Sequence, residues 1–116
     1  MKTADVEISL ALRAVDRIST KDISRLAEHF DVVDKSANGW GWVIEENGSH
    51  SSVDEAVIAF VSRLTEFRDQ IAQADPVFRV AVYNPNFTYT CRLSCAEQIS
   101  SFSAVLEISV YPTEDD

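Results

Sequence analysis

The sequence predicts a single α+β domain, in which a mostly antiparallel or mixed sheet of about five strands carries one long and two short helices on one face. Three observations predict this fold. The strand-like segments each show one apolar face, serine-capped helical segments lie between them, and no repeat or linker divides the 116 residues. Helices packed on the shared apolar face are the simplest cover for such a sheet. We expect one domain over residues 1–116, with a frayed acidic tail at 113–116.

The N-terminal part is predicted to contain a strand and a short helix. Residues 5–13 alternate in the period of a strand, and the apolar positions are Val6, Ile8, Leu10 and Leu12. Ser19 is the expected N-cap of the helix, with Ile18 and Ile23 as a hydrophobic staple. The helix is expected to end near His29, and its predicted buried stripe is Ile23, Leu26, Ala27 and Phe30.

The middle of the chain is predicted to form two strands and the long helix. Val32 and Val33 indicate a short strand, residues 35–39 a turn, and residues 40–45 a second strand. Ser52 and Glu55 form a capping box, which opens a helix of about five turns. Its predicted buried stripe is Val53, Val57, Phe60, Val61, Leu64, Phe67 and Ile71.

The C-terminal part is predicted to contain a hairpin, a short helix and a last strand. Residues 77–83 and 87–93 alternate around the turn residues 84–86, which predicts an antiparallel pair. Ser94 and Glu97 form a second capping box, opening a helix that buries Ile99 and Phe102. Residues 105–111 return to strand, and the expected inward positions are Leu106, Ile108 and Val110.

This order of elements, together with the ending FSAVLEISVY at residues 102–111, resembles the bacterial family known as domain of unknown function 4279. The family pattern is a strand, a short serine-initiated helix, a glycine- and tryptophan-containing segment, a long helix, a hairpin and a closing strand of the type L-x-I-S-x-Y. The resemblance covers nearly the whole chain. It departs at residues 32–35, where the family pattern has a proline-containing turn. The resemblance implies a fold and supplies no catalytic residues.

Composition and charge limit the kinds of partner. The chain carries 10 basic and 19 acidic residues, giving a formal charge of −9, and 46% of it is hydrophobic. This excludes intrinsic disorder, and it argues against binding nucleic acid or an anionic membrane, because both require a basic surface. No apolar leader or spanning segment is evident, and two cysteines make no disulfide framework. We therefore expect a cytoplasmic location.

No motif predicts catalysis, a metal site or a cofactor, so we expect the protein not to be an enzyme. His29, late in the first helix, and His50, expected to be solvated in the loop 47–51, lack metal-ligand spacing. Cys95 falls near a helix N-terminus, which lowers a thiol pKa, so it is a candidate reactive thiol. The alternative is that Cys91 and Cys95 are both small buried hydrophobic residues.

The predicted partner-binding segment is residues 39–55. Trp40 and Trp42 are expected to share one strand face, either as interface anchors or as part of the core under the long helix. The glycines beside them would permit close approach of a backbone, from the chain itself or from a ligand. The expected rim carboxylates are Glu45 and Glu46, at an exposed strand end, and Asp54 and Glu55, in the first turn of the helix.

Three functions follow from these observations. The first is an acidic immunity or antitoxin protein that occludes the active cleft of a basic, nuclease-type toxin. The second is a small-ligand sensor or small enzyme, which would need converging polar groups that no motif supplies. The third is a regulatory homodimer joined through an exposed strand edge, at residues 105–111 or 5–13.

Overall fold

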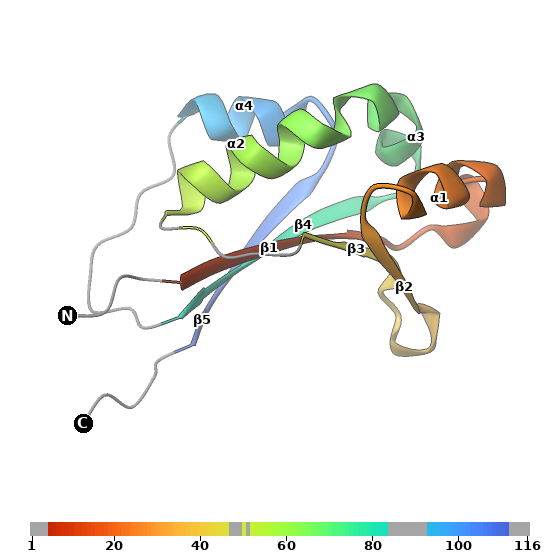
Figure 1. The fold of residues 1–116 in the computed structure, drawn as a ribbon, viewed down its shortest axis with the longest axis horizontal. Helices are drawn as coiled ribbons and strands as arrows, with labels where there is room; N and C mark the ends of the chain where they lie inside the picture. Colours follow the sequence, from red (N-terminus) through yellow and green to blue (C-terminus); the bar gives the residue numbers. More distant parts are fainter. Residues whose placement is uncertain (1–4, 47–49, 51, 84–92, 112–116) are drawn as a thin grey trace.

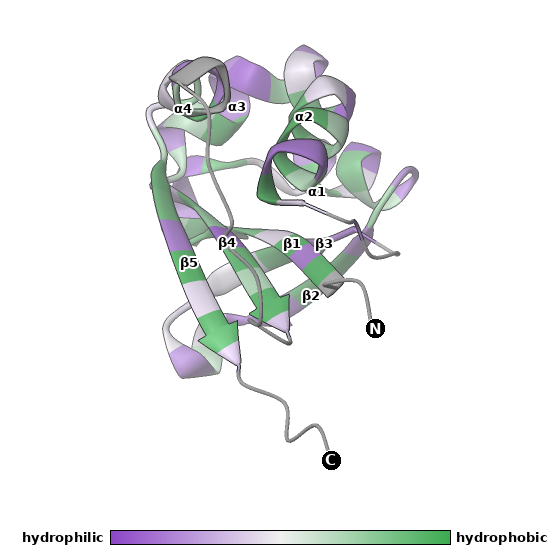
Figure 2. Cartoon of the chain, turned by 90° about the vertical axis from the view of Figure 1, so that its left-hand side faces the viewer, coloured by the Kyte–Doolittle hydropathy of each residue, from purple (hydrophilic) through white to green (hydrophobic). Residues whose placement is uncertain are grey.

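A computed structural model describes residues 5–46, 50, 52–83 and 93–111, and within them it confirms the α+β fold with a mixed five-stranded sheet. The strands are β1 (Asp5–Leu12), β2 (Asp31–Lys35), β3 (Gly41–Glu45), β4 (Pro76–Tyr83) and β5 (Val105–Tyr111). The α-helices are α1 (Thr20–Ala27), α2 (Val53–Leu64), α3 (Arg68–Gln73) and α4 (Leu93–Ser100). All four α-helices lie on the same side of the sheet (Figures 1 and 2).

The strand order is β2-β3-β1-β4-β5, so β1 is the central strand. It pairs antiparallel with β3 and β4, which excludes residues 5–12 as the exposed edge expected for a homodimer. β2 pairs antiparallel with β3, whereas β5 runs parallel to β4. The edge strands are therefore β2 and β5 among the described residues.

The predicted hairpin is only partly testable, because residues 84–92 lie outside the described part of the chain. Leu93, expected in its second strand, belongs instead to α4. The chain thus passes from β4 to β5 by way of a helix, the kind of connection that a parallel pair of strands requires.

Two of the three predicted N-caps, Ser19 and Ser52, are present, whereas Ser94 lies inside α4 and is not its N-cap. Ser19 Oγ accepts a hydrogen bond from the Asp22 amide at 3.1 Å, and Ser52 Oγ accepts one from the Glu55 amide at 3.1 Å. The predicted long helix is divided by a 3₁₀ turn at Thr65–Phe67, which separates α2 from α3. Its predicted apolar stripe is buried throughout. In α1, Ile23 and Leu26 are buried, but Ala27 is exposed, so that part of the predicted stripe was wrong.

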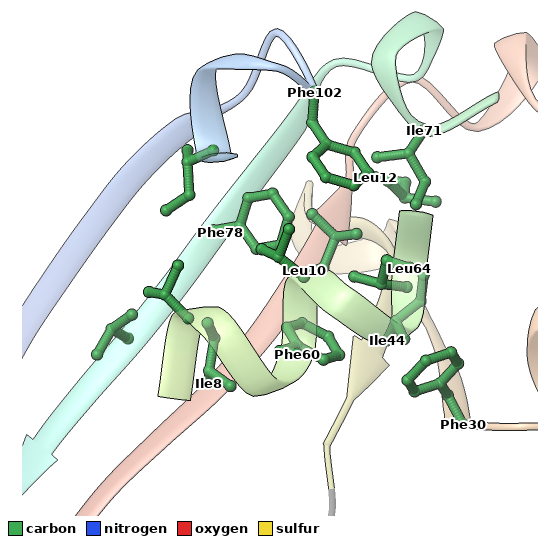
Figure 3. Close-up of a cluster of buried hydrophobic side chains, with 14 of the residues drawn as sticks. Ile8, Leu10, Leu12, Phe30, Ile44, Phe60, Leu64, Ile71, Phe78 and Phe102 are labelled. Carbon is green, nitrogen blue, oxygen red and sulfur yellow. The ribbon is translucent and has the colours of Figure 1, made fainter. Parts of the chain in front are cut away.

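The core lies between the helices and the sheet (Figure 3). Four phenylalanines cross it in successive edge-to-face contacts, with ring centroids 5.7–6.0 Å apart: Phe30, Phe60, Phe78 and Phe102. This geometry is favourable for aromatic pairs beyond the area that they bury. The rings come from the segment after α1, the middle of α2, β4 and the segment after α4, so one contiguous core joins the helices to the sheet.

At the β5 edge the cover is incomplete. Leu106 and Ile108 pack against the core as predicted, but Val110 is 39% exposed, contrary to its predicted inward position. Val105 and Tyr111 are also exposed, at 57% and 46%. An edge strand has one neighbour instead of two, which leaves its ends uncovered.

Candidate functional site

The side of the sheet opposite the helices, which we call the open face, carries the candidate site. Strand pairing places one residue of each strand in a line across it. The line we call the charged row consists of Asp31, Glu45, Ser9, Arg79 and Glu107. The next line, the apolar row, consists of Val33, Val43, Ala11, Val77 and Val105.

The basic side chains of the open face are each engaged by a carboxylate. Arg79 Nε donates a hydrogen bond to Glu107 Oε1 at 3.3 Å, and Lys35 Nζ lies 3.7 Å from Glu45 Oε1. Asp31, at the β2 edge, makes no ion pair among the described residues. Surface ion pairs of this kind add at most about 1 kcal/mol each to stability. The open face keeps a negative electrostatic potential, because its carboxylates outnumber its cations.

Trp40 covers the middle of the apolar row. It packs against Ala11, Val43 and Val77, and the Arg79 guanidinium stacks on its outer ring face, 4.0 Å from the centroid. This contact joins the apolar row to the charged row. It also holds Arg79 in place, because the guanidinium is fixed by the indole on one side and by Glu107 on the other.

A hollow of about 260 Å³ opens beside Arg79. Small side chains contributed by three adjacent strands, Ser9, Ala81 and Ser109, form part of its lining. The other residues that line it are Glu7, Ile8, Glu45, Glu46, Arg79, Val80 and Tyr111. Short residues surrounded by longer ones leave a depression on the open face. No sequence motif predicts converging polar groups, yet the strand register brings Ser9, Arg79 and Ser109 together beside the hollow.

One end of the hollow is aromatic. Tyr111 stacks on Tyr83, with ring centroids 5.3 Å apart and an interplanar angle of 22°. Burial raises the pKa of the Tyr83 hydroxyl above its ordinary value, and the negative charges of Glu7 and, when ionised, Tyr111 raise it further. The Glu7 carboxylate therefore acts electrostatically on this aromatic pair.

Glu46 and His50 form a second cluster, at the end of β3. His50 Nε2 contacts Glu46 Oε1, and His50 Nδ1 lies 3.7 Å from Glu55 Oε1 in the first turn of α2. The His50 backbone bonds to Val6 in both directions, at 2.8 and 2.9 Å. The expectation that His50 is solvated was wrong, since its side chain is only 14% exposed. Its main-chain pairing with β1 and its contacts with the two carboxylates account for this burial.

Glu46 is the most unusual of these groups. Its side chain is 6% exposed, so the prediction that it lies at an exposed strand end was wrong, whereas Glu45 is 44% exposed. Glu46 Oε2 is buried and has no hydrogen-bond partner among the described residues. A buried polar atom without a partner costs about 1–3 kcal/mol, and more when charged.

The expectation that Trp40 and Trp42 share a strand face was also wrong. Trp42 packs against the core on the helix side, whereas Trp40 packs on the open face. The cause is Gly41, whose φ of +73° interrupts the alternation of an extended strand. A Cβ at Gly41 would lie 2.1 Å from the Leu12 carbonyl oxygen. The backbone that approaches Gly41 closely is therefore that of the chain itself, at Leu12, and not that of a ligand.

The structure thus divides the predicted partner-binding residues between the open face and the helix side of the sheet. Trp40 and Glu45 belong to the open face, while Trp42 belongs to the core side. Glu55 turns toward His50, and Asp54 lies beside it in the first turn of α2. Cys95 lies in α4, as its predicted helix requires, but its side chain and Cys91 are outside what the structure describes.

Sequence reasoning missed Glu7, Arg79 and Tyr111 as members of a site. Each occupies the polar side of an alternating strand, which was the available signal. Alternation assigns a residue to a face, but only the pairing register shows which residues of different strands are neighbours.

Chemically, the described residues offer recognition by charge and shape. They contain no group of three or more side chains of the metal-binding types placed to hold an ion. His29 is exposed after α1, and its carbonyl accepts a hydrogen bond from Arg63 at 3.1 Å. No helix within the described ranges has the length and apolar character needed to cross a membrane.

Comparison with protein-family models, with curated proteins and with solved structures found no match for this chain. The resemblance to domain of unknown function 4279 therefore stays a prediction.

Proposed function

We propose that this protein is a non-enzymatic binding protein that holds a basic protein partner against the open face of its sheet. The observation that carries the proposal is the charged row. It places the carboxylates of Asp31, Glu45 and Glu107 on the face opposite the four α-helices. Glu7 adds a fourth on the same side, at the pairing position of Ala81.

Charge complementarity favours a basic occupant. The two cations of the face, Lys35 and Arg79, are each bound to a carboxylate of the same face, so they do not offset the remaining acids. The whole chain carries −9, which attracts a positively charged protein over distances near the Debye length. Such fields raise association rates and exclude acidic competitors.

The open face also offers apolar anchors beside its charges. Trp40 is half-buried in the middle of the apolar row, and Val33 and Val105 are 39% and 57% exposed at its two ends. An apolar centre with a charged surround is the usual composition of a specific protein interface. The rows together span all five strands.

An immunity or antitoxin protein is the class that these properties fit best. A nuclease-type toxin needs a positively charged cleft to bind phosphates, and carboxylates presented in a row can occupy that cleft in their place. The proposal includes a cytoplasmic location, which the use of only two cysteines supports. Inhibition by occlusion requires no chemistry from the inhibitor, which is consistent with a surface built for recognition.

The test is association with a purified partner, identified by co-purification from the native host or encoded beside this gene. The double variant Glu7→Lys/Asp31→Lys reverses two open-face carboxylates that have no ion-pair partner among the described residues. The matched control, Glu28→Lys/Glu97→Lys, makes the same charge change on the helix side, at exposed positions.

We expect the open-face variant to slow association at least tenfold at low ionic strength and to flatten its dependence on salt. The control should change the rate much less, because its charges lie on the opposite side of the molecule. Equal effects of the two variants on association would contradict binding through the open face. If no basic protein binds the purified chain, the proposed function itself is refuted.

A further inference from the structure

We propose that two copies of this chain pair through the outer edge of β5, with the two strands antiparallel and a two-fold axis at Ile108. The surface concerned is the edge of the sheet and not its open face, so the dimer and the proposed function can be tested separately. Three features of β5 support the dimer: its exposure, its small number of charges and the order of its side chains.

Among the described residues, β5 has a neighbouring strand on one side only (Figure 2). None of its seven residues is buried, although Leu106 and Ile108 contact the core. Their pairing positions on β4, Phe78 and Val80, are buried. An edge strand also presents backbone N–H and C=O groups that a further strand can bind. The outer side of β5 therefore offers both apolar side chains and backbone groups to another strand.

The two edges of the sheet differ in charge. The β2 strand has five residues, and three of them are charged: Asp31, Asp34 and Lys35. Charged side chains on an edge strand discourage pairing with another chain. The β5 strand, VLEISVY, contains no lysine, arginine or proline, and its one charged side chain, Glu107, is bound by Arg79 of β4. The β2 edge is therefore protected against a further strand, whereas the β5 edge is not.

The order of the side chains in β5 favours a second copy as the occupant. A two-fold axis perpendicular to the sheet makes the paired strands antiparallel and places residues of the same sheet face opposite each other. With the axis at Ile108, Leu106 lies opposite Val110 of the second copy, on the helix side. Val105 lies opposite Tyr111 of the second copy, on the open side. The apolar residues of β5 that are exposed in one chain thus gain cover in the dimer: Val105, Val110 and Tyr111.

Charge and length favour this register over its neighbours. With the axis at Ile108, Glu107 lies opposite Ser109 of the second copy. An axis at Glu107 would place two carboxylates opposite each other, which is destabilising. An axis at Ser109 would limit the pairing within the strand to residues 107–111 and leave Leu106 without an opposite residue. The register at Ile108 pairs all seven residues and opposes no like charges.

The test is sedimentation equilibrium of the intact chain at increasing protein concentration, up to the millimolar range, in low and in high salt. We expect a reversible dimer that strengthens as salt is added, because each copy carries −9 and salt screens the repulsion between them. Binding of a basic partner should weaken under the same change. A chain that stays monomeric in high salt at every concentration would overturn the dimer.

Val110→Lys and Val33→Lys form a matched pair of variants, since each replaces a valine of an edge strand that is 39% exposed. Val110→Lys places an ammonium group opposite Leu106 of the second copy and should weaken dimerisation about tenfold or more. Val33→Lys makes the same charge change at the β2 edge and should alter dimerisation less than about twofold. Equal effects of the two variants would show that association does not depend on the β5 edge.

Contacts between copies test the register directly. Leu106 and Val110 of one chain lie roughly 13 Å apart along the strand, too far for a nuclear Overhauser effect between them. In a mixture of isotope-labelled and unlabelled copies, we expect such effects between the methyl groups of these two residues. This measurement uses the unmodified chain, so it remains decisive if Val110→Lys disturbs the fold. A dimer without these effects would contradict the proposed pairing.

A different occupant of the edge would give a different result. If the purified chain is monomeric and Val110→Lys weakens only the binding of a basic partner, the edge receives a strand of that partner and the second copy is the wrong occupant. If the chain is monomeric and the β5 amides are protected from hydrogen exchange along the whole strand, the edge is covered within one chain. Either result would overturn the dimer and leave binding through the open face to its own test.

Discussion

Replacement of Gly41 by alanine should be among the most damaging single-atom additions in this protein. Gly41 has φ of +73°, and an added Cβ would lie 2.1 Å from the Leu12 carbonyl oxygen and 3.0 Å from the Arg13 Cα. Gly39 has a similar φ of +82°, but its Cβ would meet no atom within 4 Å. The two glycines therefore separate backbone strain from steric contact.

The magnitudes follow from these two terms. A left-handed backbone costs a non-glycine residue about 1–2 kcal/mol, and this applies to both variants. Gly41→Ala adds an overlap with main-chain atoms of β1, which can be relieved only by moving a strand; overpacking of this kind costs about 1–3 kcal/mol more. We expect a loss of about 1–2 kcal/mol for Gly39→Ala and about 2–5 kcal/mol for Gly41→Ala.

The assay is urea unfolding followed by far-UV circular dichroism, because fluorescence would report on Trp40 and Trp42 beside the substitutions. Gly41→Ala should also shift the backbone amide resonances of Leu12 and Arg13, whereas Gly39→Ala should leave them in place. Equal losses of unfolding free energy in the two variants would refute the close approach of the strands as the reason for this glycine.

Three further outcomes are expected. Phe60→Ala should lower the free energy of unfolding by about 3–5 kcal/mol in urea titrations, because it removes the ring that touches both neighbouring phenylalanines of the core. By NMR titration, the pKa of Tyr83 should lie above its ordinary value. In Glu7→Gln this pKa should fall only partly, because burial is the larger cause of the shift. The stability that Tyr83 contributes is full below about pH 10 and is lost as the pH rises through its folded pKa. Glu46→Lys should cost about 3–5 kcal/mol in thermal unfolding, whereas Glu45→Lys should cost about 1 kcal/mol or less, and similar values for the two would contradict the burial of Glu46.

Much of the fold could be predicted because its signals are local. The alternation in β1 and β4, the serine caps at Ser19 and Ser52, and the apolar stripe of α2 and α3 are properties of short segments. Each depends on backbone hydrogen bonding or burial within a few residues, so the sequence contains the needed information. The covered face of the sheet follows from the same alternation.

The wrong predictions concern features that are determined by contacts between distant segments of the chain. Trp40 and Trp42 were assigned to one face because nothing local indicates that Gly41 adopts a positive φ; that conformation is imposed by the approach of Leu12. His50 was expected in solvent because its pairing with Val6 and its contact with Glu46 join parts of the chain that only the folded sheet brings together. The division of the long helix at Thr65–Phe67 likewise carries no proline or glycine signal.

The candidate site was inaccessible from the sequence for the same reason, and this determines how an interface on the protein has to be sought. Within a continuous segment such as residues 39–55, the part that forms β3 sends successive side chains to opposite sides of the sheet. The charged row instead takes one residue from each strand, and it runs across the sheet from Asp31 to Glu107. Its members become neighbours only through the pairing register. Substitutions that follow the register therefore change one surface, whereas the adjacent pair Glu45 and Glu46 would change a surface and a buried contact together. An interface on this domain is best mapped along the rows.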